Sequence, residues 1–403
     1  MPKNYIKRDI ETKLISLSKS FPAIALTGPR QSGKSTLLKH LFGKTHEYIT
    51  FDDPLTRERA ISDPKLFIDE LKNKVIIDEI QYVPEILSYI KIAIDNKRQV
   101  KGSFLLTGSQ QFTMIKNLGD TLAGRIALLE LLPFSSNEIM GNKKTENTMN
   151  TFVSSCLRGS YPELITEKKI DLDSWYGSYI STYIERDVKS IYDIGNLRDF
   201  HRFLQLLASR TAQLINLSTY ANELGASVNT IKKWLSILEA SRIIHILSPY
   251  YENMGKRIVK SPKVNFLDCG IVCYLTGIKD KKHLINGPMA GALFETFCIQ
   301  ETIKTFFNQG IKPEIYFLRT SNDLEIDLII RGKNNTLFPF EIKFTKTPRP
   351  SMSSNIEKFK TLFTNLKISR GNIISLTGEN LTLSKETHAI RFNDYIENLK
   401  KIV

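Results

Sequence analysis

Short apolar runs separated by helix-compatible segments mark the amino-terminal third of the chain. The runs are Ala23–Leu26, Val75–Ile77, Phe104–Leu106 and Ile126–Leu132. A run that is apolar at nearly every position, rather than at every second one, is typical of a strand buried on both faces of a parallel sheet. Helical spacing precedes the first run, at Arg8–Leu17, and follows it, at Ser35–Leu41. The pattern predicts an α/β domain built on a parallel sheet.

The middle of the chain has longer helical patterns. Trp175–Val188 and Phe200–Ala208 are helix-compatible, and the aromatic residues of the first recur at helical spacing, as expected of a core stripe. Further on, Ser218 can cap a helix that ends at Gly225, and a second helix is predicted over Val228–Ala240.

This second helix has two chemically different faces. One face is apolar, with Val228, Ile231, Leu235 and Leu238, and the other is polar, with Ser227, Asn229, Thr230, Lys232 and Lys233. Two strands, Ile243–Leu247 and Ile258–Val264, are predicted to form a hairpin after it. A helix–turn–helix followed by a hairpin predicts a winged helix. It could read a DNA groove or serve only for packing and protein contacts.

The carboxyl-terminal part returns to strands. Leu324–Ile330 alternates between apolar and polar residues, and the next strand carries Glu341 and Lys343, which alternation places on one face. A helix over Ser354–Leu366 and a strand over Asn372–Leu376 follow.

The segment between the first strand and its helix has the sequence G-x-x-x-x-G-K-S, from Gly28 to Ser35. Glycines in such a loop let backbone N–H groups turn toward phosphate oxygens, and the helix amino terminus favours an anion. Lys34 would contact the β- and γ-phosphates, and the Ser35 hydroxyl would bind Mg²⁺. We therefore expect ATP and Mg²⁺ as cofactors, with a nucleotide-binding loop made of Gly28, Pro29, Arg30, Gln31, Ser32, Gly33, Lys34, Ser35 and Thr36.

Two carboxylates, Asp78 and Glu79, end the second apolar run. In open α/β sheets ligands bind at the carboxyl ends of the strands, so this pair is predicted to lie at the nucleotide. Asp78 would hold the Mg²⁺ shell and Glu79 would orient the attacking water. The alternative is a strand followed by an acidic helix cap. Asp52 and Asp53, after another predicted strand, could likewise support Mg²⁺ or cap the next helix, and capping is favoured.

Lysine and arginine outnumber acidic residues by 56 to 42, a formal net charge of +14. Such a surplus favours polyanionic partners such as DNA, although a lysine-rich surface without that function would give the same net charge.

The four cysteines are not at zinc-ligand spacing, so reduced thiols in a cytoplasmic protein are expected. We find no signal peptide and no apolar run long enough to cross a membrane.

Several motifs resemble a group of prokaryotic AAA-like P-loop ATPases fused to a C-terminal domain of unknown function. Besides the phosphate-binding loop and Asp78-Glu79, they are Leu106-Thr107-Gly108-Ser109, Leu122-Ala123-Gly124-Arg125, Leu132-Pro133-Phe134-Ser135, Arg158-Gly159-Ser160-Tyr161-Pro162-Glu163 and Ser261-Pro262-Lys263-Val264-Asn265-Phe266-Leu267-Asp268. The resemblance covers nearly the whole chain. In AAA-type ATPases a polar residue on the third strand senses the γ-phosphate, which points to Ser109, with Thr107 as the alternate. Arg125 is a candidate arginine finger, in cis or from a neighbouring subunit, or else a structural ion-pair partner.

The last part resembles the PD-(D/E)xK nuclease fold in the order of its elements and residues. The resemblance implies that Asp327 and Glu341 bind a divalent ion, that Lys343 activates water or stabilises the phosphate, and that Glu295 completes the shell. The alternative is a nuclease-like fold in which the carboxylates pair with Lys343 and the domain only binds.

We expect four parts: an AAA-like ATPase domain (1–140), a helical connector (141–208), a winged-helix module (209–265) and a nuclease-like domain (266–403). The leading hypothesis is a Mg²⁺-dependent ATPase that acts on DNA or on a DNA-bound partner and can assemble as a homo-oligomer. The alternatives are a nucleotide-gated, metal-dependent nuclease and a non-hydrolysing scaffold or regulator that responds to ATP.

Overall fold

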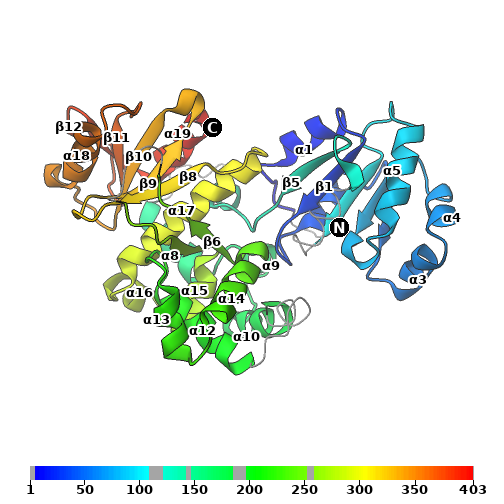
Figure 1. Cartoon of the computed structure of the whole chain (residues 1–403), viewed down its shortest axis with the longest axis horizontal. Coiled ribbons are helices and arrows are strands. Elements are labelled where there is room, and N and C mark those ends of the chain that lie inside the picture. The colour runs from blue at the N-terminus through cyan, green and yellow to red at the C-terminus, as the bar shows by residue number, and fades with distance from the viewer. Residues whose placement is uncertain (1–4, 109–120, 142–146, 185–196, 252–257, 403) are drawn as a thin grey trace.

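The computed structural model describes residues 5–108, 121–141, 147–184, 197–251 and 258–402. It contains a five-stranded sheet near the amino terminus and a six-stranded sheet near the carboxyl terminus. Helices lie between them and, below both in the view, form a third region (Figure 1).

The first sheet is parallel, in the order β2-β3-β4-β1-β5. Its strands are β1 (Ala23–Thr27), β2 (Glu47–Thr50), β3 (Val75–Asp78), β4 (Phe104–Gly108) and β5 (Ile126–Glu130). Every residue of β1, β3 and β4 is buried, which confirms the sheet predicted from the continuous apolar runs.

Helices cover both faces of this sheet, and this explains why its central strands are continuous apolar runs in the sequence. Ile24 and Leu26 pack with α1 (Glu11–Ser18) and α2 (Lys34–Phe42), whereas Ala23 and Ala25 face the opposite core. That second core is closed by α3 (Pro54–Ser62), α4 (Pro64–Asp69) and α5 (Ile86–Asn96). Strand β5 forms an edge and is less covered, with Leu128 47% exposed.

The middle region is helical. Its elements are α7 (Ser136–Met140), α8 (Thr148–Leu157), α9 (Pro162–Thr166), α10 (Leu172–Tyr179), the π-helix η2 (Ile180–Ile184), α12 (Leu197–Ser209), α13 (Leu217–Leu224), α14 (Val228–Ala240), α15 (Cys269–Thr276) and α16 (Lys281–Asn286). Tyr176 and Tyr179 are buried, as predicted for a core stripe, and the rings of Trp175 and Tyr179 stack with centroids 5.2 Å apart. The end of the helix predicted over Trp175–Val188 lies outside the described residues.

The two predicted helices and the turn between them are formed, but Asn216 caps the first helix, not Ser218 as predicted: the Asn216 side chain accepts from the N–H groups of Ser218 and Thr219. Gly225, with φ +65°, ends α13, and the Ser227 hydroxyl caps α14. Two antiparallel strands follow, β6 (Ile244–Leu247) and β7 (Lys263–Phe266). The second strand was predicted to begin at Ile258, but Ile258 instead bridges to Thr320 in the carboxyl-terminal region, so β7 is short.

The second sheet has the order β12-β13-β11-β10-β9-β8. Its strands are β8 (Ile315–Arg319), β9 (Glu325–Arg331), β10 (Leu337–Lys343), β11 (Gly371–Ser375), β12 (Leu381–Ser384) and β13 (Thr387–Arg391). Its helices α17 (Ala290–Asn308) and α19 (Phe392–Ile402) share one core with it, and α18 (Ser354–Leu362) packs in another. The order of α17, β9, β10, α18 and β11 matches the predicted order of elements, whereas β8, between α17 and β9, was not predicted.

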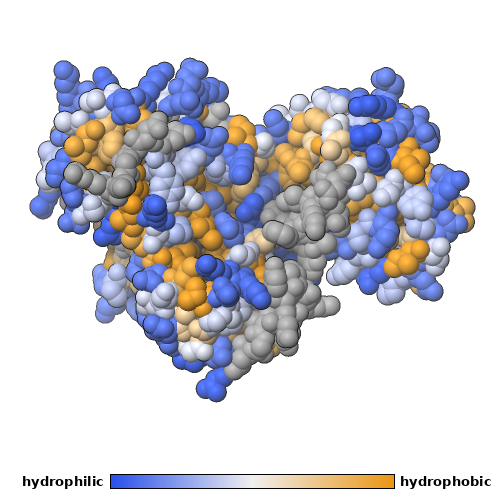
Figure 2. Space-filling model, in the orientation of Figure 1, coloured by the Kyte–Doolittle hydropathy of each residue, from blue (hydrophilic) through white to orange (hydrophobic). Residues whose placement is uncertain are grey.

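One cluster of buried apolar side chains extends from the end of the first sheet through the middle helices to α19. It crosses residues 208 and 265, where we expected domain boundaries, so those boundaries remain predictions. On the face shown in Figure 2, hydrophilic side chains predominate along the outer rim, and apolar side chains occur in scattered groups.

Candidate functional site

The predicted phosphate-binding loop connects β1 to α2 at the carboxyl edge of the first sheet. Gly28 has φ +144°, and a Cβ atom there would lie 2.1 Å from the carbonyl oxygen of Leu131. Gly33 has φ +93° and directly precedes α2. Only glycine fits the first position, because both the backbone conformation and the close approach exclude a side chain.

A cavity of about 500 Å³ opens beside this loop. Polar residues of the loop and of α2 line it, including Arg30, Gln31, Lys34, Ser35 and Thr36. Less polar side chains also line it, those of Tyr5, Ile6, Phe134 and Pro162. Pro162 belongs to α9, so the middle region contributes to this cavity.

Lys34 is only 5% exposed although it carries a charge. Its Nζ atom donates hydrogen bonds to the carbonyl oxygens of Gly28, at 3.0 Å, and Pro29, at 2.9 Å. The loop therefore curls around the ammonium group, which places a positive charge at the centre of the ring of backbone atoms.

Three neighbouring strands bring polar side chains together around Asp78. Asp78 ends β3 and is 5% exposed; its Oδ2 atom accepts a 2.6 Å hydrogen bond from the Tyr48 hydroxyl of β2, and its Oδ1 atom accepts one from the Thr107 hydroxyl of β4. Burial and this hydrogen bond to Asp78 raise the pKa of Tyr48 above its usual range, so Tyr48 remains a donor.

The other acids lie around the cavity. Glu79 follows Asp78 in a left-handed conformation, φ +57°, lines the cavity and accepts a hydrogen bond from Gln81. Asp52 also lines it, and burial together with the charges of Glu79 and Asp78 raises the Asp52 pKa. Asp53 caps α3 by accepting from the Thr56 N–H at 3.1 Å. The favoured capping role is thus right for Asp53, whereas Asp52 faces the cavity.

Two predicted site residues are not part of this arrangement. Ser109 lies outside the described residues, whereas its alternate, Thr107, contacts Asp78. Arg125 lies at the amino end of β5, the opposite edge of the sheet from the phosphate-binding loop, and pairs with Asp95 at 2.7 Å. It does not reach the loop of its own chain here, so the role in cis is not supported.

Arg8 is a residue of this site that the sequence did not single out. It is 3% exposed, lines the cavity and donates to the Ser32 carbonyl of the loop at 2.9 Å. Its position at the start of the helix predicted over Arg8–Leu17 gave no chemical signal, because its partners Leu132 and Glu138 are distant in sequence.

The predicted second site is a compact cluster of acids and lysines. Lys343 Nζ lies 3.1 Å from Asp327 and 2.5 Å from Glu341, and Lys263 Nζ lies 2.9 Å from both Glu295 and Glu325. The structure therefore brings together all four predicted residues. Lys263, contributed by β7, was not predicted.

Burial governs the charges of this cluster. Desolvation and the charge of Asp327 raise the pKa of Glu341 to about 8, although Lys343 opposes the shift. Desolvation likewise raises the pKa of Glu295 to about 7. Among the residues that the structure describes, no three histidine, cysteine, aspartate or glutamate side chains are grouped to hold a metal ion. The lysine ammonium groups lie against these carboxylates instead.

The polar face predicted for α14 is on the surface. Asn229, Lys232 and Lys233 are exposed, whereas Ile231 and Leu235 are buried. Val228 was predicted on the apolar face but is 37% exposed at the first turn of the helix.

A parallel sheet with a glycine loop around a buried lysine, and an acid at the end of β3, which β4 separates from β1, defines an AAA-like P-loop ATPase domain. A family model described as "AAA domain" matches residues 20–140, and one described as "Domain of unknown function (DUF4143)" matches residues 290–395. Between them, residues 149–282 match a second domain of unknown function, DUF8612. The chain belongs to the family of AAA-like P-loop ATPases fused to a C-terminal domain of unknown function.

Its relatives include the uncharacterized proteins Rv2008c of Mycobacterium tuberculosis and Mb2031c of Mycobacterium bovis. Each is 30% identical over 351 residues, which is 86% of this chain and 76% of the relative. Among solved structures, the Walker-type ATPase PABY2304 of Pyrococcus abyssi is 16% identical, with a TM-score of 0.46 over 68% of this chain and 97% of that one. The RuvB Holliday junction branch migration motor of Thermotoga maritima is 17% identical, with a TM-score of 0.30 over 60% and 89%.

Within the part of the chain that the structure describes, no helix is both long and apolar enough to span a membrane.

Proposed function

We propose that the protein binds ATP with Mg²⁺ and hydrolyses it. The observation that carries the proposal is the cavity at the loop, where a buried lysine, a helix amino terminus and carboxylates occur together. Cations and backbone N–H groups suit phosphates, and the hydroxyl and carboxylate oxygens of Ser35 and Asp78 suit Mg²⁺.

Each residue then has a role in phosphoryl transfer to water. Lys34 leaves the carbonyls of Gly28 and Pro29 to neutralise charge on the β- and γ-phosphates. Ser35 and Asp78 hold Mg²⁺, with Asp78 oriented by Tyr48 and Thr107. Glu79, which lines the cavity, positions the attacking water.

The less polar residues that line the cavity suit the purine base. The Tyr5 ring stacks on His40, with centroids 3.6 Å apart, and its hydroxyl donates to Glu11 at 2.7 Å, so its orientation is fixed from two sides. Ile6 and Pro162 complete an apolar wall for a flat ring.

ATP turnover and ATP affinity of the wild type and Lys34→Ala test the proposal. We expect binding to fall by two orders of magnitude or more, because the variant loses the charge that faces the phosphates. Unaltered turnover in Lys34→Ala would refute the assignment. Tight binding without turnover in the wild type, with or without DNA, would instead favour the ATP-responsive regulator.

We further propose that hydrolysis acts on DNA or on a DNA-bound partner. Supporting features are the net charge of +14 and the exposed lysines of α14, at the position of the recognition helix in a winged helix.

The domain boundaries that we propose are those expected from the sequence: 1–140, 141–208, 209–265 and 266–403. A cytoplasmic location is supported by the cysteines of the described residues, all of which are buried and not in disulfides. In a homo-oligomer, Arg125 would have to act on a neighbouring subunit.

A metal-dependent nuclease is the second candidate, supported by Asp327, Glu341 and Lys343 meeting on adjacent strands. A cation there would require Lys343 to move from between the two acids, with Glu295 completing the shell. Plasmid incubated with Mg²⁺ or Mn²⁺ tests it: cleavage that disappears in Asp327→Ala supports the site, and cleavage that survives places it elsewhere.

A further inference from the structure

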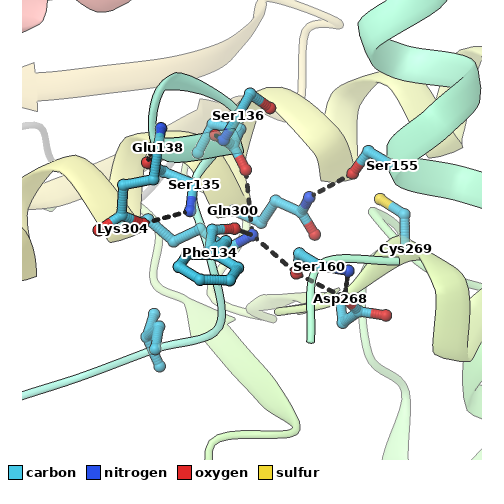
Figure 3. A network of polar contacts seen from close by, with 12 residues as sticks. Phe134, Ser135, Ser136, Glu138, Ser155, Ser160, Asp268, Cys269, Gln300 and Lys304 are labelled. Carbon is cyan, nitrogen blue, oxygen red and sulfur yellow. Dashed lines mark hydrogen bonds and ion pairs between the residues drawn. The ribbon is translucent and has the colours of Figure 1, made fainter. Parts of the chain in front are cut away.

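A series of buried polar contacts connects the phosphate-binding loop to helix α17, far along the chain. Figure 3 shows the part of it around Phe134 and Lys304. Its first member is Arg8, whose guanidinium group uses all three nitrogens. Nη1 donates to the carbonyl of Ser32 at 2.9 Å, Nη2 to that of Leu132 at 2.6 Å, and Nε to the Glu138 carboxylate at 2.9 Å. One side chain thus fixes the loop against the segment that follows β5.

Glu138 continues the series. Its side chain is fully buried and accepts from the backbone N–H of Ser135 at 2.7 Å and of Asp9 at 2.9 Å, besides pairing with Arg8. Ser135 in turn caps α7, so the short segment between β5 and α7 is held from two directions. The Arg8 guanidinium also lies 4.6 Å from the centre of the Phe134 ring.

The same segment is held by α17. The N–H of Ser136 donates to Glu301 at 2.6 Å, and Lys304 Nζ donates to the Phe134 carbonyl at 2.9 Å and to Glu301 at 3.0 Å. Glu301 and Lys304 are 2% and 1% exposed, so neither charge has water to replace a lost partner. Figure 3 shows this lysine reaching from its helix to the segment that carries Phe134.

Lys304 also reaches the cavity side of the middle region. Its Nζ atom lies 3.1 Å from the Ser160 hydroxyl, which donates to Asp268 at 2.6 Å (Figure 3). Two residues further on, Pro162 begins α9 and lines the cavity. Helix α17 is therefore connected to two segments that line the cavity, directly at Phe134 and, through Ser160, close to Pro162.

Buried charges with several partners cannot shift one at a time, because each unpaired group would remain unsatisfied in a medium of low dielectric constant. A movement of the loop against Arg8 must therefore be accommodated by the segment 132–138 and by α17 together. The same helix carries Glu295 of the acid and lysine cluster.

We infer that Arg8 is a positioning residue that holds the phosphate-binding loop and couples it to α17, so that nucleotide binding and the packing of α17 stabilise each other. The inference depends on the proposed nucleotide site and adds to it a link to the carboxyl-terminal region. Coupling of this kind is reciprocal: a change in α17 alters ATP affinity, and ATP alters the stability of α17.

The first test measures the dissociation constant for ATP with Arg8→Lys, which keeps the charge but loses the fork of donors. We expect binding to weaken by roughly tenfold or more, since the loop loses its fixed position. The matched control is Arg242→Lys, because Arg242 also pairs across the chain, with Glu130 of β5, but does not line the cavity. It should retain wild-type affinity.

The second test uses the variant Glu301→Gln. Glu301 belongs to α17 and is not one of the residues that line the cavity in the described structure. We expect ATP affinity to fall by roughly fivefold or more. Amide hydrogen exchange should show that saturating ATP slows exchange in α17 of the wild type, and that this protection is smaller in both variants. Melting curves without nucleotide establish whether each variant is folded. If Arg8→Lys does not fold, Glu301→Gln alone tests the coupling.

The outcomes separate the inference from the proposed function. A wild type that binds no ATP would refute the nucleotide site itself. A wild type that binds ATP while both variants bind equally well would overturn the positioning role. The coupling would be overturned if Arg8→Lys binds ATP more weakly while Glu301→Gln keeps both wild-type ATP affinity and full protection of α17 from exchange. If Arg242→Lys loses as much ATP affinity as Arg8→Lys, the loss comes from weaker packing between regions in general and the specific role of Arg8 is overturned.

Discussion

At the scale of single residues, the candidate site depends on backbone conformations that few side chains permit. Gly28 has φ +144° and faces a carbonyl, Gly33 precedes α2 at φ +93°, and Glu79 is left-handed at φ +57°. A left-handed glutamate costs roughly 1–3 kcal/mol, and such residues cluster at functional sites. In this chain the left-handed Glu79 lines the cavity.

We predict that Gly28→Ala destabilises the fold and abolishes ATP binding. A Cβ atom 2.1 Å from the Leu131 carbonyl forces the backbone apart, at about 1–3 kcal/mol for the overlap and a further 1–2 kcal/mol for the positive φ. Thermal unfolding and ATP binding measure both effects. Gly124→Ala is the control, since at φ +73° it has no atom within 4 Å in the described structure and should lose only about 1 kcal/mol. Equal losses in the two variants would contradict the close-approach argument.

At the scale of elements, strand ends and short connections decide which side chains meet. Strands β2, β3 and β4 are parallel neighbours, so Tyr48, Asp78 and Thr107 lie at one edge although they are far apart in sequence. The hairpin of β6 and β7 does the same for the second region, since β7 delivers Lys263 to Glu295.

The hairpin also carries a pH-dependent contribution to stability. Burial, reinforced by the charge of Arg242, lowers the pKa of His245 in β6 to about 4. In the unfolded chain this histidine titrates near its ordinary value of about 6.5. Between these values the unfolded state binds the additional proton, so stability falls as the pH drops from about 6.5 towards 4.

We therefore predict that His245→Gln removes part of the acid sensitivity of unfolding, roughly 2–3 kcal/mol by pH 4. Denaturant unfolding of the wild type and the variant across this pH range measures the difference. His283→Gln, on the exposed surface of α16, should keep the wild-type profile. Parallel pH profiles for wild type and His245→Gln would show that the histidine is not responsible.

At the scale of the whole molecule, three regions share contacts that no single region contains. The apolar core extends from the segment after β5 to α19, and buried hydrogen bonds join that segment to Glu301 and Lys304 of α17. Any DNA bound at α14 would therefore contact a region packed against both the nucleotide cavity and the acid and lysine cluster.

For DNA binding we predict that Lys232→Glu with Lys233→Glu weakens affinity for duplex DNA and reduces the slope of log affinity against log salt by about 2. Both side chains are exposed on α14, so the fold should not change. The matched control is Lys281→Glu with Lys282→Glu, which alters the net charge equally on α16. DNA affinity is measured for each protein over a series of salt concentrations. Identical salt slopes for the wild type and the α14 variant would show that α14 does not contact phosphates.

The sequence was sufficient for features that are local along the chain. Apolar runs gave the strands of the parallel sheet, because burial on both faces leaves no polar position, and the glycine spacing gave the loop around Lys34. Alternation placed Glu341 and Lys343 together. Helix boundaries around Gly225 also followed, since only a few residues accept its backbone conformation.

What only the tertiary structure decided are contacts between residues far apart in sequence. Arg8 and Glu138 are 130 positions apart, and Ser136 and Glu301 are 165 apart. Nothing near Arg8 distinguishes it from a surface arginine, and nothing near Lys263 indicates that it meets Glu295. Hydrophobic periodicity reports which face of an element is buried, but not which element covers it. That choice is made by packing, and it determined the partners of Arg8, Glu138 and Lys263.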